Sequence, residues 1–210
     1  MNILLMANWG IGLEILGALH LNSLVKDIIV VTHHDAESED PWQNAVFSQA
    51  DEYGYTLYDE TRVNSDEMIK IIKKNKIDLL VTHAYMKLLP EQVFNAPSEG
   101  SVNIHPSLLP KYRGPSPTQW VLKNKEPETG LTCHVIDSGM DTGPIIHQTR
   151  IQVTSVETID TIIEKLKTIV APLMDASIRK INDEDFIPKV QDHAQASIAP
   201  RIMNGRNNNV

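Results

Sequence analysis

Two residues suited to carbonyl chemistry, Asn103 and His105, stand two positions apart at the end of an apolar segment. A neutral imidazole can take or give a proton near pH 7, and an Asn amide can donate a hydrogen bond to a developing oxyanion. A carboxylate nearby would orient the imidazole and favour its charged form. Asp141 lies in a turn-rich segment, DSGMDTG, that we expect at the same edge of the fold. The set suits attack of a nucleophile on a carbonyl carbon, although each residue alone is also typical of a cap, a packing contact or a turn.

The elements that must position these side chains follow an alternating pattern. Short apolar runs predict five strands, and amphipathic or capped segments predict helices between them. The expected strands are 2–8, 27–32, 55–58, 77–82 and 101–104, and the expected helices are 12–22, 41–53 and 65–75. This alternation predicts an α/β fold with a doubly wound, mostly parallel sheet and helices on both faces. Asn103 and His105 then fall at the carboxyl end of the fifth strand, where such sheets bind ligands.

The pattern changes in the last third of the chain. Residues 130–136 and 144–153 predict two more strands, which we expect to be non-parallel or at an edge. A long helix is expected over 157–180, with a kink at Pro172. We expect one domain over residues 1–202 and a disordered, Asn-rich tail over 203–210.

Composition narrows the class of protein. The chain has 210 residues, 41% of them hydrophobic, and a formal net charge of −8, which disfavours a broad nucleic-acid-binding face. Its single cysteine, Cys133, excludes an intramolecular disulfide and a thiolate cluster for zinc. No apolar run is long enough to span a bilayer, and the first residues lack a signal-peptide pattern, so we expect a cytoplasmic protein without membrane contact.

Other common motifs are incomplete or missing. Gly10-Ile11-Gly12 begins a dinucleotide fingerprint, but Ile15 stands where its third glycine belongs. The sequence has no P-loop, no GxSxG and no HExxH. His33-His34-Asp35 has no further ligands at suitable spacing, so we expect no metal site.

Two segments together identify a family resemblance. NIHPSLLP at 103–110 and HVIDSGMDTGPII at 134–146 resemble the formyltransferases that use 10-formyltetrahydrofolate. These include glycinamide ribonucleotide, methionyl-tRNA and sugar N-formyltransferases. The resemblance extends from the first strand to about residue 202. It implies 10-formyltetrahydrofolate as the formyl-donating co-substrate.

The resemblance also assigns residues. It implies that Asn103, His105 and Asp141 are catalytic, and the match to the family's D-x-G selects Asp141 over Asp137, whose share in the role stays open. Asn103 and His105 would stabilise the oxyanion, while Asp141 would raise the pKa of His105 and collect the amine proton through a water. The segment YMKLL matches the family's folate-binding segment, which assigns folate contacts to Tyr85, Met86, Lys87, Leu88 and Leu89.

The amine acceptor is less clearly specified. The loop ANWGIG lacks the Gly-rich phosphate loop of the glycinamide ribonucleotide enzymes, whereas SLLPKYRGPSPTQW and QDHAQASIAPRI resemble methionyl-tRNA formyltransferases. However, residues 32–64 are acidic where those enzymes carry a basic insertion, and their second domain is not expected here, so we expect tRNA not to be the acceptor.

Residues 32–64 instead resemble the enzyme that formylates UDP-4-amino-4-deoxy-arabinose. A nucleotide-linked amino sugar, or a similar small amine, is therefore the leading acceptor. Lys111 and Arg113 are expected to contact its phosphates, with simple loop solvation as the alternative. A folate-binding regulatory paralogue without activity stays open as a non-enzymatic alternative, and the oligomeric state, a homodimer included, is left open.

Overall fold

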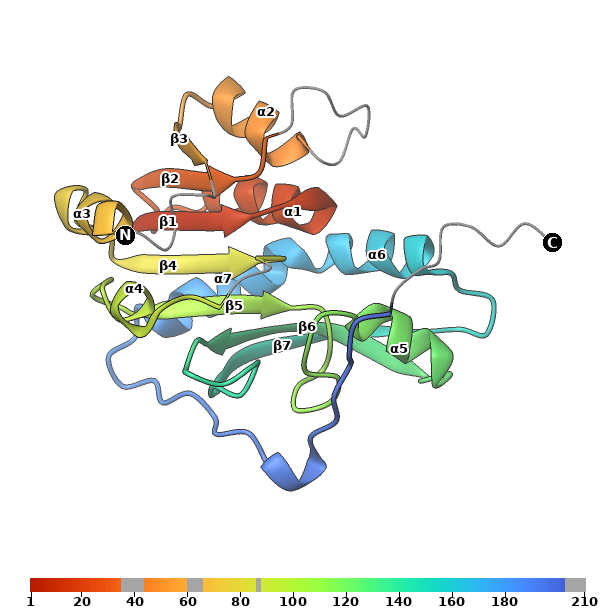
Figure 1. The fold of residues 1–210 in the computed structure, drawn as a ribbon. Helices are drawn as coiled ribbons and strands as arrows, with labels where there is room; N and C mark the ends of the chain where they lie inside the picture. The colour runs from red at the N-terminus through yellow and green to blue at the C-terminus, as the bar shows by residue number, and fades with distance from the viewer. Residues whose placement is uncertain (35–43, 60–65, 86–87, 203–210) are drawn as a thin grey trace.

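The computed structural model describes residues 1–34, 44–59, 66–85 and 88–202, which form a single sheet flanked by helices (Figure 1). The strands are β1 (Asn2–Ala7), β2 (Asp27–Thr32), β3 (Thr56–Asp59), β4 (Leu79–His83), β5 (Ser101–His105), β6 (Glu128–Val135) and β7 (Ile145–Gln152). The helices are α1 (Trp9–His20), α2 (Ala45–Glu52), α3 (Asp66–Lys74), α4 (Glu91–Phe94), α5 (Pro117–Lys123), α6 (Ile159–Thr168), α7 (Val170–Ile181) and the 3₁₀ turn η2 (His193–Gln195).

The sheet has the strand order β3-β2-β1-β4-β5-β6-β7. Neighbours from β3 to β5 pair in parallel, whereas β6 pairs antiparallel with both β5 and β7. This confirms the doubly wound, mostly parallel sheet and the non-parallel strands expected after residue 130. Strand order reverses between β1 and β4, so the carboxyl ends of β4 and β5 lie beside a topological switch point.

Successive side chains of the buried strands point to opposite faces of the sheet and pack in two apolar clusters, one on each face. Ile3 and Leu5 of β1 pack in the cluster that includes α1, α2, α6 and α7, whereas Leu4 and Met6 pack in the cluster with α3 and α4. Because both faces of a parallel strand are covered, its sequence is apolar throughout and not alternating. The expectation of helices on both faces is confirmed (Figure 1).

The prediction of a single long helix over 157–180 is wrong. The segment forms two helices, α6 and α7, that meet at Ile169, whose backbone (φ −102°, ψ 1°) leaves the α-helical region. Pro172 lies in the first turn of α7, where backbone N–H groups make no intrahelical hydrogen bonds, so the lack of an N–H at proline does not disturb the helix. The break therefore precedes the proline by three residues and is not a proline kink.

Smaller differences concern element ends. Helix α1 begins at Trp9 and not at 12, and the short helices α4 and α5 lie in segments for which the sequence predicted no helix. Three expectations fall outside the described residues: the start of the helix expected over 41–53, the first residue of the helix expected over 65–75, and the tail 203–210.

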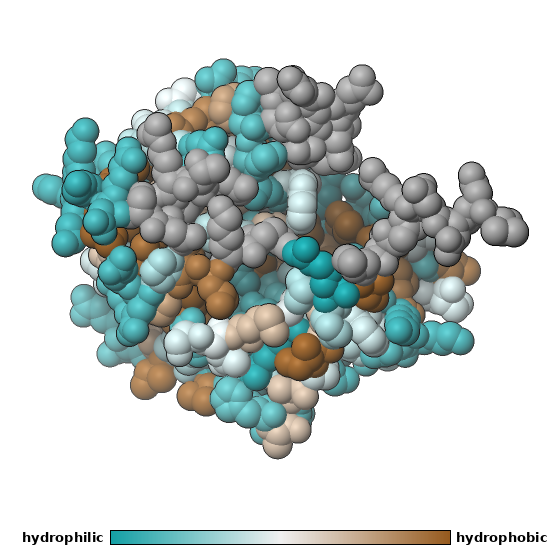
Figure 2. Space-filling model, in the orientation of Figure 1, coloured by the Kyte–Doolittle hydropathy of each residue, from teal (hydrophilic) through white to brown (hydrophobic). Residues whose placement is uncertain are grey.

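On the face shown in Figure 2, hydrophilic side chains surround several separate apolar patches. Large exposed apolar side chains include Met140 and Ile198. Among the described residues, none of the helices combines the length and apolar character needed to cross a membrane.

Candidate active site

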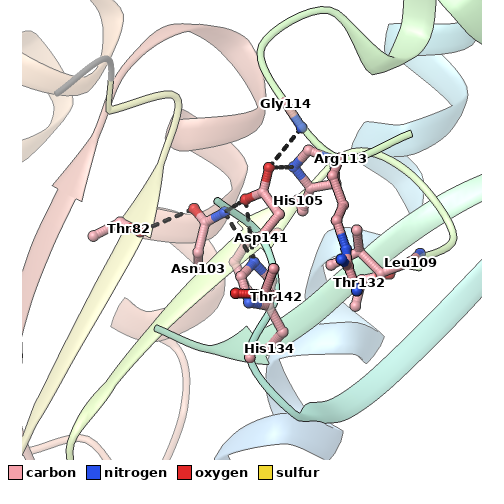
Figure 3. A network of polar contacts seen from close by, with 12 residues as sticks. Thr82, Asn103, His105, Leu109, Arg113, Gly114, Thr132, His134, Asp141 and Thr142 are labelled. Carbon is pink, nitrogen blue, oxygen red and sulfur yellow. Dashed lines mark hydrogen bonds and ion pairs between the residues drawn. The ribbon is translucent and has the colours of Figure 1, made fainter. Parts of the chain in front are cut away.

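Three polar side chains stand in a row across the carboxyl half of the sheet. Strand register places Thr82 of β4 beside Asn103 of β5, and Asn103 beside His134 of β6. Figure 3 shows that His105 and Asp141 join this row from the end of β5 and from the β6–β7 loop.

The orientation of the Asn103 amide is fixed from both ends. The Thr82 hydroxyl donates to Asn103 Oδ1 at 2.9 Å, so Nδ2 points the other way, 3.3 Å from Asp141 Oδ1 and 3.2 Å from His134 Nε2. His134 Nδ1 lies 2.9 Å from the Val135 carbonyl, which assigns the proton to Nδ1 and leaves Nε2 as an acceptor. The Asn103 amide therefore presents N–H donors to the site.

His105 is 4% exposed, and its Nε2 lies 2.8 Å from the Tyr112 carbonyl oxygen. Nε2 must carry a proton to donate this hydrogen bond, so in the neutral ring Nδ1 is the basic atom. Nδ1 lies 3.6 Å from Asp141 Oδ2. Burial lowers the pKa of His105 by more than Asp141 and the Tyr112 carbonyl raise it. Asp141 therefore does raise the pKa of His105, as the sequence predicted, but desolvation outweighs the carboxylate and the net shift is downward.

Asp141 reaches His105 from a loop with a left-handed backbone (φ 55°). Its Oδ2 accepts a hydrogen bond from the Gly114 N–H at 2.8 Å. Burial by itself would raise the pKa of Asp141, but the positive charge of His105 and His134 in their protonated forms and the Gly114 N–H together hold it well below its usual range. Asp141 is therefore a carboxylate at neutral pH.

Asp137 has a different environment. Its Oδ1 accepts hydrogen bonds from the Thr142 hydroxyl at 2.6 Å and the Gly139 N–H at 3.1 Å. Both contacts lie within its own turn, so the structure gives Asp137 a local role and brings Asp141 to the row of polar side chains.

Tyr85 lies two residues beyond the end of β4, and the folate-binding segment expected from the sequence is 85–89. Tyr85 and Leu89 pack against the cluster that contains α3, and Leu88 is 77% exposed. Met86 and Lys87 lie outside the described residues. The folate contacts that the family resemblance implies for these five residues stay predictions.

Lys111 and Arg113 occupy contrasting environments on the β5–α5 loop. The Lys111 side chain is 56% exposed, with Nζ 3.7 Å from Glu126 Oε2. Arg113 is only 6% exposed, and its guanidinium contacts Gln191 and His193 of the C-terminal segment. Phosphate contact by either residue stays a prediction.

Sequence reasoning did not select Thr82, His134 or the Gly114 N–H. A usable signal existed for the two side chains, since both are polar residues near the ends of buried strands. The backbone donor at Gly114 gave no signal in the residue types. Although two imidazoles and a carboxylate meet here, no group of three or more His, Cys, Asp or Glu residues in the described part of the chain is arranged to hold a metal ion.

A Rossmann-like sheet with an amide, an imidazole and a carboxylate at its carboxyl edge defines the class of protein. The chain belongs to the formyl transferase family, whose model matches residues 3–174. This confirms the resemblance found in the sequence motifs.

Curated relatives include two bacterial methionyl-tRNA formyltransferases. The protein from Kosmotoga olearia is 43% identical over 153 residues, which cover 73% of this chain and 49% of that protein. The one from Acetivibrio thermocellus is 38% identical over 142 residues, which cover 68% of this chain and 46% of that protein. The chain therefore spans about half the length of the curated relatives it matches.

Solved structures share the fold at lower identity. Phosphoribosylglycinamide formyltransferase from Bacillus halodurans has a TM-score of 0.74 at 22% identity, covering 88% of this chain and 96% of that one. An N-formyltransferase from Helicobacter canadensis, in complex with folinic acid and dTDP-3-aminofucose, has a TM-score of 0.73 at 20% identity, covering 95% and 70%. At these identities the likeness establishes the fold.

Proposed function

We propose that this chain transfers a formyl group from 10-formyltetrahydrofolate to a primary amine. The observation that carries the proposal is the convergence of Asn103, His105 and Asp141 at one sheet edge in a formyl transferase family chain. The reaction requires an oxyanion donor and a proton carrier, and these three side chains supply both.

The first step is attack of the amine nitrogen on the formyl carbon, which places negative charge on the formyl oxygen. We assign Asn103 Nδ2 as the donor for this oxygen: Thr82 holds the amide oxygen away from Asp141, and the formyl oxygen would replace Asp141 or His134 as the acceptor of one Nδ2 hydrogen. Removing one preorganised oxyanion donor typically costs about 10²–10³ in rate.

The second requirement is proton transfer. The acceptor amine loses one proton as the new C–N bond forms, and N10 of the folate gains one as its bond to the formyl carbon breaks. His105 Nδ1 is the free basic atom that carries this proton, through a water where the distance requires it. The imidazolium would lie between two acceptors, the Tyr112 carbonyl and Asp141, so burial does not prevent its transient formation.

The folate co-substrate is assigned to residues 85–89. Backbone groups of this segment would contact the pterin, with Tyr85, Met86, Lys87, Leu88 and Leu89 lining the site. The support is the segment's place after β4 and the exposed apolar side chain of Leu88. A partly apolar lining with a few backbone hydrogen bonds is typical of small-molecule sites.

For the acceptor, we propose a primary amine on a nucleotide-linked sugar, or a similar small amine. The net charge of −8 and the acidic run ESED at 37–40 disfavour a polyanionic partner. Residues 37–40 lie outside the described residues. Lys111 supports the proposal as an exposed cation on the loop that contributes Gly114 to the site.

A second acceptor, methionyl-tRNA, is favoured by a different observation. The curated relatives at 43% and 38% identity are methionyl-tRNA formyltransferases. This identity weighs directly against the composition argument, so the two acceptors must be compared in one experiment.

The test is an acceptor screen with 10-formyltetrahydrofolate as donor. Purified protein is offered amino-sugar nucleotides, glycinamide ribonucleotide and methionyl-tRNA, and formation of the formylated product is followed by mass spectrometry. We expect transfer to at least one amino-sugar nucleotide. Transfer to methionyl-tRNA alone would replace the proposed acceptor. Folate binding without transfer or hydrolysis would favour a regulatory folate-binding protein and contradict the proposed enzyme.

A further inference from the structure

A side chain remote in sequence from the motif, Gln191, is bonded directly to the loop that carries Asp141. Gln191 lies between α7 and η2 and is 4% exposed. Its Nε2 donates to the carbonyls of Asp141 at 2.9 Å and Gly143 at 2.7 Å, and its Oε1 accepts from Arg113 Nε at 3.2 Å and Nη2 at 2.7 Å. A primary amide has two donor hydrogens and two acceptor lone pairs, so this amide is fully used.

The two carbonyls that Gln191 binds flank the turn on either side of Thr142. Asp141 has a left-handed backbone (φ 55°), a conformation that is uncommon for residues other than glycine, although aspartate tolerates it better than most. On its other side, Gly143 packs closely against β6: a Cβ at this position would lie 1.9 Å from the Val135 carbonyl oxygen, so only glycine fits here. The loop is thus held between β6 and the Gln191 amide.

Arg113 connects the same amide to the other loop of the site. Its guanidinium is buried and also contacts His193 Nδ1 at 3.1 Å. The residues on either side of Arg113 serve the site directly, since the Tyr112 carbonyl accepts from His105 and the Gly114 N–H donates to Asp141. The two loops that position His105 and Asp141 therefore meet at one buried amide.

We propose that Gln191 is a positioning residue that holds the Asp141 carboxylate against His105, and that Arg113 fixes the orientation of the Gln191 amide. The importance of this position for turnover rests on the proposed function, but the geometric claim does not. Removing the amide deprives the buried Gly143 carbonyl and the partly buried Asp141 carbonyl of this donor and frees the turn to relax. A displacement of about 1 Å can cost about 10²-fold in rate.

The primary test uses Gln191→Met, which matches the side-chain length without donors or acceptors. In protein with ¹⁵N-labelled histidine, the His105 signals are assigned with His105→Gln and titrated by NMR. Asp141 raises the pKa of His105, so its displacement lowers that pKa further. The other titratable groups facing His105, His83 and His134, are unchanged by the substitution.

We expect the His105 pKa in Gln191→Met to fall toward its value in Asp141→Asn. Gln195→Met is the matched control, because Gln195 is exposed on the same segment, and it should titrate like the parent protein. An unchanged His105 pKa in Gln191→Met would overturn the proposal. If Gln191→Met does not fold, Gln191→Asn keeps the amide one methylene short and must give the same direction.

Kinetics with the acceptor found in the screen give an independent reading. We expect kcat to fall about 10²-fold in Gln191→Met with little change in either KM. Arg113→Met should add little in the double variant if it acts only through Gln191. An additive loss expressed in the acceptor KM would overturn the role given to Arg113 and favour phosphate contact instead. If the parent protein transfers no formyl group but the His105 shift is seen, the proposed function fails and the positioning inference stands.

Discussion

His105 and Asp141 lie at ion-pair distance, with Nδ1 of the imidazole 3.6 Å from Oδ2 of the carboxylate. The separation is longer than a hydrogen bond, and Oδ2 already accepts from the Gly114 N–H. A neutral imidazole has no proton to share at Nδ1, because its proton is on Nε2. The attraction between His105 and Asp141 becomes strong only when the imidazole takes a second proton. In the proposed reaction this happens when His105 accepts the proton of the amine.

Replacing Asp141 should therefore reduce turnover strongly. In Asp141→Asn the imidazolium loses its anionic partner, and we expect kcat to fall by about 10² or more. Asp137→Asn is the matched control, because Asp137 bonds only within its own turn in the described contacts. Steady-state formyl transfer by both variants checks this. A slow Asp137→Asn protein beside a near-normal Asp141→Asn protein would reverse the assignment.

The Thr82 hydroxyl should affect turnover by orienting the Asn103 amide. Thr82→Val keeps the side-chain shape but removes the donor to Asn103 Oδ1, so the amide is no longer held with Nδ2 toward the site. A single hydrogen bond is worth about 1 kcal/mol, so we expect kcat to fall about fivefold with the folate KM unchanged. Thr82→Ser keeps the hydroxyl and should be close to the parent. Equal losses in the two variants would show that packing, not the hydroxyl, is responsible.

His83 should make folding stability depend on pH. It is buried beneath the site, its Nδ1 lies 2.8 Å from the Ile104 carbonyl, and burial lowers its pKa from 6.5 to about 4, with His105 adding to the effect. The folded protein therefore binds fewer protons than the unfolded chain between these values. The contribution of neutral His83 to the free energy of unfolding is fully present above pH 6.5. It is lost as the pH falls toward 4, and the loss is roughly 3 kcal/mol.

The measurement is urea unfolding of the parent and of His83→Gln above pH 6.5 and near pH 4. We expect the free energy of unfolding of the parent to decrease more than that of the variant. His20→Gln controls for removal of an exposed histidine and should follow the parent. Parallel curves for the parent and His83→Gln would contradict the expectation.

Local sequence signals were sufficient for most of the sheet. Continuous apolar runs such as DIIVVT predicted buried parallel strands, because strands covered on both faces have no polar side. The helix break at Ile169 was not predicted, since Pro172 offered a stronger local signal than any residue at the break itself. Tertiary packing of α6 and α7, not propensity, decides where these helices end.

The candidate site was predictable only where side chains carried the information. Asn103, His105 and Asp141 stand in motifs, and the structure brings all three together. The Gly114 N–H and the Tyr112 carbonyl act through the backbone, so their residue types predicted nothing. Gln191 is 50 residues from Asp141 in the chain, and only the folded C-terminal segment brings its amide to the loop.

Salt dependence should separate the two candidate acceptors. A tRNA is bound through many phosphates, and each neutralised phosphate releases counterions, so its binding weakens steeply as salt is added. A sugar nucleotide carries few phosphates, and an acidic chain of net charge −8 offers no broad cationic face. We expect the acceptor KM for a small amine to change little between low and moderate salt.

Lys111→Ala should raise that acceptor KM more than it raises the folate KM. Lys125→Ala, which removes another charge from the turn after α5, is the matched control and should leave both constants unchanged. Methionyl-tRNA turnover whose KM rises steeply with salt, with amino-sugar nucleotides inert, would show that the acidic residues after β2 do not keep tRNA from the site.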